Sequence, residues 1–361
     1  MAISEWDQGA RDGAGRARLA AKMIEAMPEP AVLVESDGHC LAANRPAVAL
    51  LPALRPGEPL VRALRSPDVL DAFRRVVADG DAETVIWSER VPVERLFDVH
   101  VAPIRSDRGV VEMALLTVRD LTEGRRLERM RADFIANASH ELRTPLASML
   151  GFIETLQGSA REDETARDRF LVIMREQGRR MARLIEDLLS LSRIEQKQHV
   201  RPDASIDLAQ VARHVADTLS PLAHEFGAEI RVAAKGPVTV AGDRDELVRV
   251  AENLIDNAIK YGTRAGVPQG GLIEVTVESR GRDGALTVRD HGRGIPSEHL
   301  PRLTERFYRV DVGQSRAKNG TGLGLAIVKH ILARHRGRLT IASRPNDGST
   351  FSALIPLHER R

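Results

Sequence analysis

The spacing of apolar residues changes twice along the chain, which divides it into three stretches. In the first stretch, short apolar or alternating runs predict strands, and Asp37-Gly38 between two such runs is a strong hairpin signal. We expect strands at residues 31–35, 40–44, 83–93, 96–104 and 110–118, and helices at residues 19–27 and 60–78. This order predicts an α+β domain over residues 19–120, after a Gly-, Arg- and Asp-rich segment, residues 1–18, that we expect to be disordered.

The second stretch, residues 121–200, has no strand signal, and its apolar residues recur at helical spacing. Residues 158–163 interrupt the pattern, so we expect two long helices joined by a short turn. A helical hairpin cannot bury its apolar face alone, and the simplest partner is a second copy of the chain, which would complete a four-helix bundle. Pro145 lies inside the first helix and is expected to bend it, because proline lacks an N–H and its ring clashes with the carbonyl of Glu141.

The third stretch, residues 201–361, mixes helix and strand signals and predicts a second α+β domain. Its helices are expected at residues 207–226, 243–261 and 322–336, and its strands at residues 228–233, 272–280, 284–290, 338–343 and 349–356. The fold class predicted for the whole chain is therefore α+β with several domains.

Composition narrows the class of protein further. With 53 basic and 51 acidic residues the formal charge is +2, which gives no reason to expect nucleic acid as the partner. One cysteine, Cys40, excludes an internal disulfide framework and suits a reducing compartment. No run reaches the about 20 apolar residues that span a bilayer, so we expect a cytoplasmic protein as the sequence is given, with a membrane anchor upstream left open.

The helix predicted over residues 243–261 carries a polar face. Asn253, Asn257 and Lys260 are four and three residues apart, so they share one side of that helix. Amide oxygens and an ammonium suit hydrated Mg²⁺ and its phosphates, because Mg²⁺ takes oxygen ligands and keeps water. A solvated helix face explains the same residues, so this motif alone does not distinguish a Mg²⁺ and phosphate site from an ordinary polar surface.

Two further motifs follow. Asp290-His-Gly-Arg-Gly294 comes directly after an apolar strand, where glycines allow close approach to a flat ligand and the carboxylate can accept an amine of a base. A turn that requires positive φ is the alternative. Glu305-Arg-Phe-Tyr-Arg309 precedes a polar stretch and is either the anchor of a lid or a packed loop.

The last motif, Gly320-Thr-Gly-Leu-Gly324, precedes a helix whose N-terminal amides can meet phosphate. Its spacing is not the dinucleotide-binding fingerprint, and the chain has neither a P-loop nor the H-R-D and D-F-G motifs of protein kinases. Each of the four motifs is modest on its own, and their fixed order makes coincidence a poor explanation.

In that order the four motifs resemble the N, G1, F and G2 boxes of the ATP-binding domain of two-component sensor histidine kinases. Residues 137–146, NASHELRTPL, resemble the H box of their dimerisation and phosphotransfer domain. The resemblance covers residues 120–358, and the set is most similar to the PhoR-like, phosphate-regulon branch. Residues 19–120 resemble a PAS sensor domain more loosely, through topology and the terminal Asp120-Leu-Thr122.

The resemblance implies a protein-histidine kinase that uses ATP and Mg²⁺. His140 would take the γ-phosphoryl group and pass it to an aspartate of a response regulator, with Glu141 as base and Thr144 orienting a water that dephosphorylates the regulator. Asn257 would bind Mg²⁺, and Asn253 and Lys260 would lie near the phosphates. The remaining implied nucleotide contacts are Tyr261 at the base or ribose, Asp290 at the adenine amine, Arg309 at the γ-phosphate, and Gly292, Gly294, Gly320, Thr321, Gly322, Leu323 and Gly324.

The family further implies a homodimer with a PAS-like sensor over residues 19–120, a dimerisation and phosphotransfer domain over residues 121–200 and an ATP-binding domain over residues 201–361. The PAS-like domain would bind a ligand or a protein partner. Two other functions stay open: a protein acting mainly as a regulator phosphatase or signalling scaffold, and an ATPase of the wider gyrase and chaperone superfamily. Acid-labile labelling from ATP that depends on His140 distinguishes the kinase from both.

Overall fold

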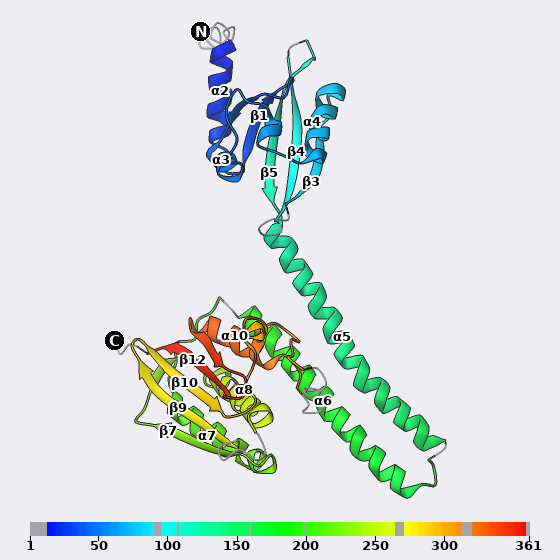
Figure 1. Cartoon of the computed structure of the whole chain (residues 1–361), viewed down its shortest axis with the longest axis vertical. Helices are drawn as coiled ribbons and strands as arrows, with labels where there is room; N and C mark the ends of the chain where they lie inside the picture. The colour runs from blue at the N-terminus through cyan, green and yellow to red at the C-terminus, as the bar shows by residue number, and fades with distance from the viewer. Residues whose placement is uncertain are drawn as a thin grey trace. The chain divides into compact units, whose positions relative to one another are not determined.

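The computed structural model describes residues 13–89, 95–106, 108–158, 160–197, 199–263, 271–311 and 320–358. The chain forms two compact units, Met1–Asp133 and Phe134–Arg361 (Figure 1). Helix α5, Thr122–Gln157, begins in the first unit and continues into the second.

The first unit is a five-stranded antiparallel sheet with helices on both faces. Its strand order is β2-β1-β5-β4-β3. The strands are β1 (Ala31–Glu35), β2 (Cys40–Ala43), β3 (Glu83–Glu89), β4 (Arg95–Arg105) and β5 (Val111–Asp120), and the helices are α2 (Gly13–Glu25), α3 (Arg45–Leu50), η1 (Leu60–Arg62) and α4 (Pro67–Asp79). On β1, Val32 and Val34 join the core that includes α4, while Ala31 and Leu33 pack with Ile24 of α2. Burial on both sides explains the continuous apolar run of this strand.

Asn44 joins α2, β1 and α3 at one buried point. Its side chain is fully buried, and its Oδ1 accepts hydrogen bonds from the N–H groups of Ala31 (2.9 Å) and Ala47 (3.0 Å). Its Nδ2 donates to the carbonyls of Ile24, Met27 and Glu29. One amide therefore caps α3 and satisfies the backbone of the turn that follows α2.

Two sequence expectations change in this unit. Helix α2 begins at Gly13, inside the segment of residues 1–18 that we expected to be disordered, and not at residue 19. Helix α3 was not expected, although Asn44 before Pro46 is a helix-start signal. Residues 1–12 of the expected disordered segment, and the end of the strand expected at 83–93, lie outside the described residues.

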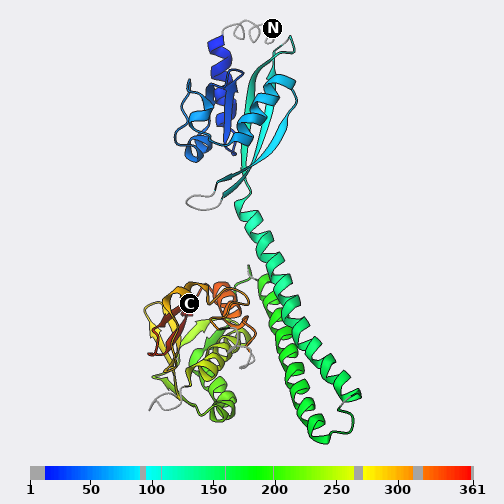
Figure 2. The same cartoon turned by 45° about the vertical axis from the view of Figure 1, so that its right-hand side comes forward.

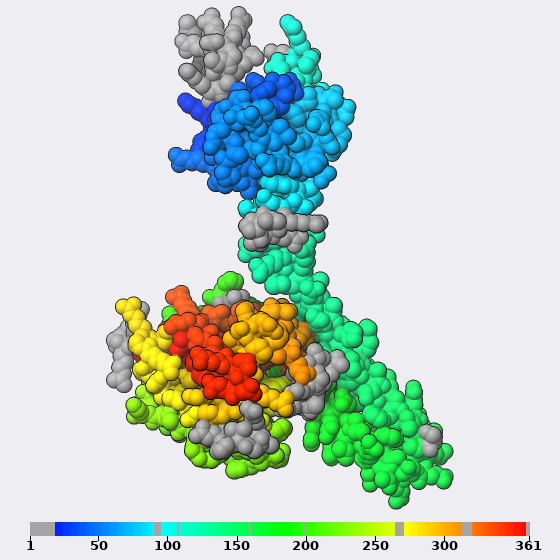
Figure 3. All heavy atoms as spheres, viewed as in Figure 1, coloured from blue at the N-terminus to red at the C-terminus, as the bar shows by residue number. Residues whose placement is uncertain are grey.

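The second unit opens with a helical hairpin, as predicted. Helices α5 and α6 (Glu164–Gln196) run side by side in both views (Figures 1 and 2), and their atoms form one elongated teal-to-green body in Figure 3. Asp163 caps α6 by accepting from the N–H of Ala166 at 2.9 Å, and the rings of Phe152 and Phe170 lie 5.0 Å apart between the helices. Pro145 is buried, and α5 continues through it without a break, so the expected hinge stays a prediction.

The rest of the second unit is an α/β structure with sheet order β11-β12-β10-β9-β7, in which only β7 and β9 pair in parallel among the named strands. The strands of this sheet are β7 (Glu229–Ala234), β9 (Leu272–Arg280), β10 (Asp283–Asp290), β11 (Arg338–Ser343) and β12 (Ser349–Pro356). The helices are α7 (Leu208–Glu225), α8 (Arg244–Gly262), α10 (Gly324–Arg334) and the short 3₁₀ helix η2 (Ser297–Arg302). A separate two-stranded sheet pairs β6 (Ser205–Asp207) with β8 (Thr239–Ala241). Apolar residues of α7, α8, α10 and the sheet form one core, and the predicted α+β class is confirmed. Within the described residues, no helix has both the length and the apolarity needed to cross a membrane.

Candidate functional site

The end of strand β10 forms one wall of the site. Asp290 is 6% exposed, and its Oδ1 accepts hydrogen bonds from the N–H groups of Gly292 (2.9 Å) and Ser349 (3.3 Å). Burial raises the pKa of Asp290, which those two hydrogen bonds partly oppose. Both bonds use Oδ1, so within the described part of the chain Oδ2 is left for a ligand.

Glycines bring α8 against this carboxylate. A Cβ added to Gly262 would lie 2.4 Å from the Cβ of Asp290, and one added to Gly292 would lie 2.5 Å from the carbonyl oxygen of Tyr261. Gly294 has φ +67°, and a Cβ there would meet the carbonyl oxygen of Arg344 at 1.8 Å. The end of α8 and the end of β10 therefore touch through Gly262 and Gly292, and Gly294 has the positive φ of the alternative turn, while the predicted close approach to a flat ligand stays a prediction.

Helix α8 meets the start of α10 at the other side of the site. A Cβ on Gly324 would lie 2.4 Å from Oδ1 of Asn253, whose Nδ2 donates to the carbonyl of Arg249 at 2.8 Å. Asn257 is half-buried one turn further along, and Lys260 is 9% exposed with its Nζ 2.5 Å from Oδ2 of Asp256. Three of the predicted motifs, far apart in sequence, thus converge on α8.

The segments on either side of residues 312–319 are joined to each other. The N–H of Phe307 donates to the carbonyl of Gly322 at 2.8 Å, and both residues have positive φ, +63° and +74°. A non-glycine residue in that region is strained, and here the surrounding contacts hold it. Residues 312–319 of the polar stretch that follows Arg309 lie outside the described residues, so the role of the motif as a lid anchor or a packed loop is not tested.

The G2 segment, residues 320–324, also contacts the hairpin. Thr321 donates through Oγ1 to Oδ2 of Asp187 on α6 at 2.8 Å and accepts from the N–H of Leu323 at 3.3 Å. Gly320 is half-buried, while the side chain of Leu323 is fully buried in the core. Leu323 is therefore available to a nucleotide only through its backbone.

His140, the predicted phosphoacceptor, is exposed on α5, and its neighbour Glu141 is held by two arginines. Oε2 of Glu141 accepts from Nη2 of Arg180 on α6 at 2.9 Å and from Nη2 of Arg309 at 3.0 Å. The side chain of Arg309 is 5% exposed. The hydroxyl of Thr144 donates to the carbonyl of His140 at 3.1 Å, one helical turn back.

Further contacts between the hairpin and the α/β structure that follows it, the part of the chain expected to bind ATP (residues 201–361), were not predicted. Arg306 pairs with Glu195 of α6 at 2.5 Å, and its guanidinium lies 5.0 Å from the ring centroid of Phe134 on α5. Arg249 of α8 pairs with Asp187 at 3.0 Å. In the sequence, Glu195 and Asp187 occupy ordinary polar positions of an amphipathic helix. Nothing in the sequence therefore distinguishes them from acidic residues that face solvent.

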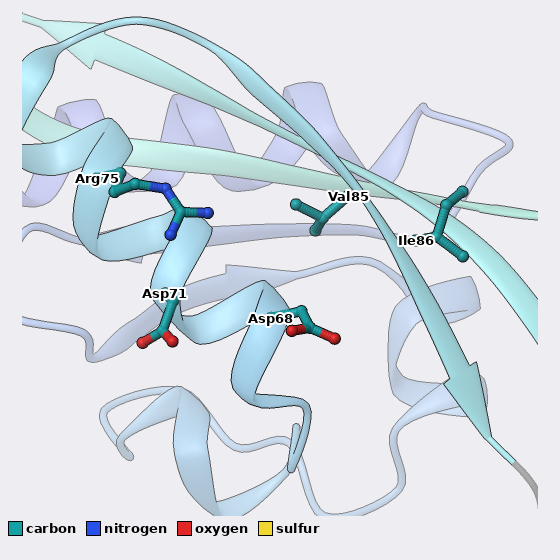
Figure 4. Close-up of a pocket in the computed structure, with 5 residues that line it drawn as sticks. All are labelled: Asp68, Asp71, Arg75, Val85 and Ile86. Atoms are coloured by element: carbon teal, nitrogen blue, oxygen red, sulfur yellow. The ribbon is translucent and has the colours of Figure 1, made fainter.

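A shallow depression of about 300 Å³ on the first unit is separate from this site (Figure 4). Asp68, Asp71 and Arg75 of α4 line it together with Val85 and Ile86 of β3. Arg75 is bound by Glu83 at 2.6 Å and Asp71 by Arg74 at 2.7 Å. Two of its three charged groups, Asp71 and Arg75, already pair with neighbouring side chains, so we assign no ligand to the depression.

Comparisons with known proteins place the chain in a family. Residues 130–197 match the His Kinase A (phospho-acceptor) domain, and residues 242–359 match the histidine kinase-, DNA gyrase B- and HSP90-like ATPase domain. The phosphate regulon sensor protein PhoR of Pseudomonas aeruginosa is 35% identical over 334 residues, which cover 91% of this chain and 72% of PhoR. The sensor-like histidine kinase SenX3 of Mycolicibacterium smegmatis is 37% identical, covering 80% of this chain and 82% of SenX3. Among solved structures, the histidine kinase AdeS of Acinetobacter baumannii is 26% identical, with a TM-score of 0.48, covering 61% of this chain and 98% of AdeS.

The chain therefore belongs to the two-component sensor histidine kinases, and its enzymatic activity is that of a protein-histidine kinase that uses ATP. Within that family it is a PhoR homologue. Membership implies a homodimer and a response regulator as partner.

Proposed function

We propose that this kinase autophosphorylates His140 and transfers the phosphoryl group to an aspartate of its response regulator, in phosphate-regulon signalling. The observation that carries the proposal is the contact between Arg309 and Glu141, at 3.0 Å. Through it, a segment that flanks the ATP-binding part reaches the residue next to the exposed imidazole of His140. This contact between the hairpin and the proposed ATP site supports transfer from ATP to His140.

In the proposed reaction, the neutral His140 imidazole attacks the γ-phosphorus through one ring nitrogen, and its other nitrogen carries the proton. A P–N bond forms while the bond from the γ-phosphorus to the bridging oxygen breaks, and ADP leaves with the electron pair of that bond. Glu141 accepts the hydrogen bond of the ring N–H and takes its proton as the ring becomes cationic. Phosphoryl transfer depends mostly on positioning and charge neutralisation, which Arg309, Lys260 and Asn253 would supply.

ATP binding is proposed at the converging motifs, with Oδ2 of Asp290 accepting the adenine amine and Tyr261 beside the base or ribose. Gly292, Gly294, Gly320, Gly322 and Gly324 would give the backbone close access to the nucleotide, as would Thr321 and the N–H of Leu323. Mg²⁺ would be held by Asn257 and would neutralise phosphate charge. This set fits Mg²⁺, because the ion binds through few protein oxygens together with phosphates and water.

The hairpin provides a surface for the second copy of a homodimer. Large apolar side chains are exposed on both helices: Leu146, Leu150 and Ile153 on α5, and Leu171, Val172, Ile185 and Leu189 on α6. A depression of about 540 Å³ lies beside Ile185 and Leu189. An exposed apolar stripe of this length supports the proposed four-helix bundle between two copies.

For the first unit we propose a PAS-like sensor domain over residues 19–120. The strand order β2-β1-β5-β4-β3 and the helices on both faces of its sheet support this proposal. A ligand or a protein partner at this domain remains part of the proposal.

The phosphoacceptor assignment is tested by incubating the whole protein with radiolabelled ATP and Mg²⁺. Wild type is expected to gain acid-labile, alkali-stable label, and H140Q is expected to gain none while still binding ATP. The matched control is H199Q, because His199 is also exposed but lies beyond α6. Label in H140Q equal to wild type would overturn the assignment.

One observation favours a second activity, dephosphorylation of the regulator. In the conformation described, Glu141 is held by two arginines, and Arg309 is turned toward it. In this state Arg309 contacts Glu141, so it is not engaged with the γ-phosphate as autophosphorylation requires. Thr144 lies on the next turn, where it would orient a water. Removal of phosphate from the regulator by unlabelled wild type, lost in T144A, would support this activity as the main one.

Neutralising Asp187 is expected to speed autophosphorylation severalfold. Its carboxylate holds both Arg249 and Thr321, so D187N weakens the attachment of the G2 segment to α6 and frees it for the nucleotide. The initial rate of labelling at saturating ATP measures this effect. E186Q is the matched control, since Glu186 is an exposed neighbour on the same helix. Equal rates in D187N and E186Q would contradict the expectation.

A further inference from the structure

Arg180 of α6 is unusual among the arginines of the hairpin, because its side chain is only 11% exposed. Its Nη2 lies 2.9 Å from Oε2 of Glu141, whose side chain is 18% exposed. Ion pairs between fully exposed side chains are weak, because water screens them and both chains must be ordered. This pair is largely shielded from water, so its attraction and its geometry are better maintained.

Arg309 contacts the same oxygen of Glu141, at 3.0 Å. The two arginines differ in where they come from. Arg180 is on the helix that packs beside α5 in the hairpin, whereas Arg309 belongs to the F segment, residues 305–309, of the ATP-binding part. When Arg309 turns to the γ-phosphate, as the proposed function requires, Glu141 loses that partner and keeps Arg180.

We infer that Arg180 is a positioning residue for autophosphorylation, which holds the Glu141 carboxylate beside His140 when Arg309 engages ATP. A glutamate on an open helix surface has three rotatable side-chain bonds, and fixing it costs conformational entropy. Arg180 fixes one oxygen, Oε2, and leaves Oε1 to accept the N–H of the His140 ring. The inference rests on the proposed role of Glu141 as the base, because Arg180 acts only through that side chain.

Removing the Arg180 guanidinium is expected to lower the rate of phosphoryl transfer and to leave the affinity for ATP unchanged. Arg180 is on the hairpin and contacts Glu141, so removing its guanidinium leaves the residues proposed for the nucleotide on α8 and β10 in place. Loss of orientation of a catalytic group by about 1 Å can cost up to about 100-fold in rate. Because the carboxylate remains next to His140 and only its restraint is lost, we expect about a tenfold loss for R180Q.

The test compares autophosphorylation by R180Q, R180K, E141Q and the double variant R180Q/E141Q in the full chain. R180Q should lower kcat about tenfold with an unchanged KM for ATP, and R180K, which keeps the cation, should recover part of the loss. In the E141Q background, R180Q should cause less than a twofold further change. R179Q is the matched control, because Arg179 is the exposed neighbour on the same helix, and it should keep the wild-type rate.

A full rate in R180Q while E141Q is impaired would overturn the inference and leave the proposed base intact. A tenfold loss from R180Q that persists in the E141Q background would also overturn it, since Arg180 would then act independently of Glu141. A full rate in E141Q would overturn both the base and the inference. If R180Q unfolds below the assay temperature, R180K replaces it in the test. A partial loss of autophosphorylation rate in R180K that disappears when E141Q is also present supports the inference. An equal loss of rate with and without E141Q overturns it.

Discussion

Replacing Asp290 with asparagine is expected to weaken ATP binding about 100-fold while leaving the free protein at least as stable at neutral pH. Asparagine keeps an Oδ1 that can accept from Gly292 and Ser349, so the local fold is preserved. In place of Oδ2 it presents an NH₂ group, so in the proposed complex two hydrogen-bond donors, this group and the amine of adenine, would face each other. Losing a charge-assisted hydrogen bond and leaving a donor unpaired accounts for about 2–3 kcal/mol, or about 100-fold.

The stability of the D290N variant follows from the direction of the pKa shift. Burial raises the pKa of Asp290 in the folded protein above the ordinary value of 3.8. A carboxyl with a raised folded-state pKa contributes stability that is fully present below its unfolded pKa and is lost as pH rises through the folded-state pKa. At pH 7 the ionised wild-type side chain therefore costs stability, and D290N removes that cost.

Calorimetric titration with ATP and thermal unfolding from pH 4 to pH 8 would measure both effects. The melting temperature of D290N should equal or exceed that of wild type at pH 7, and its advantage should shrink as the pH is lowered and the wild-type carboxyl takes up a proton. D283N is a suitable control, because Asp283 begins the same strand and pairs with Arg338, away from the site. Normal ATP binding by D290N would exclude the adenine contact, and clear destabilisation at pH 7 would show that the ionised carboxylate supports the fold.

The sequence predicts the ATP-binding part well because its elements are long and regular. The strands expected at 338–343 and 349–356 match β11 and β12, and the helix expected at 243–261 matches α8 within one residue at each end. The three-residue strands β6 and β8 were missed, since three residues carry too little periodicity to be distinguished from loop. The strained backbone of Phe307 was likewise not predictable from the sequence, because its positive φ accompanies a hydrogen bond to Gly322, fifteen residues later, and does not follow from local sequence.

The site shows the same division between local and long-range information. Motif spacing indicates that Asn253 and Asn257 share a face of α8, because helical geometry alone decides it. The partners of Glu141 do not follow from spacing, since Arg180 and Arg309 lie 39 and 168 residues away. A carboxylate expected to serve as a base is thus found bound by two cations through the same oxygen, Oε2, and only the tertiary structure reveals these partners.

Substituting Gly322 with alanine is expected to weaken ATP binding about tenfold, because this glycine joins the two segments on either side of residues 312–319. A Cβ at Gly322 would lie 2.9 Å from the Cα and 3.0 Å from the carbonyl carbon of Phe307, and both are backbone atoms that cannot rotate away. The hydrogen bond from the N–H of Phe307 to the carbonyl of Gly322 would have to lengthen or break. The G2 backbone would then lose the position from which we propose that its N–H groups meet phosphate, and we expect this loss to cost about 1.4 kcal/mol of binding free energy.

G281A separates this contact from the effect of backbone conformation. Gly281 also has positive φ, +63°, in the turn between β9 and β10, but a Cβ there would meet nothing within 4 Å. Both variants should lose about 1–2 kcal/mol of folding stability, because alanine is strained at positive φ. Only G322A should also lose ATP affinity, measured by calorimetric titration at a temperature where both variants are folded. Equal ATP affinities in the two variants would mean that the packing of Gly322 against Phe307 does not position the phosphate-binding backbone.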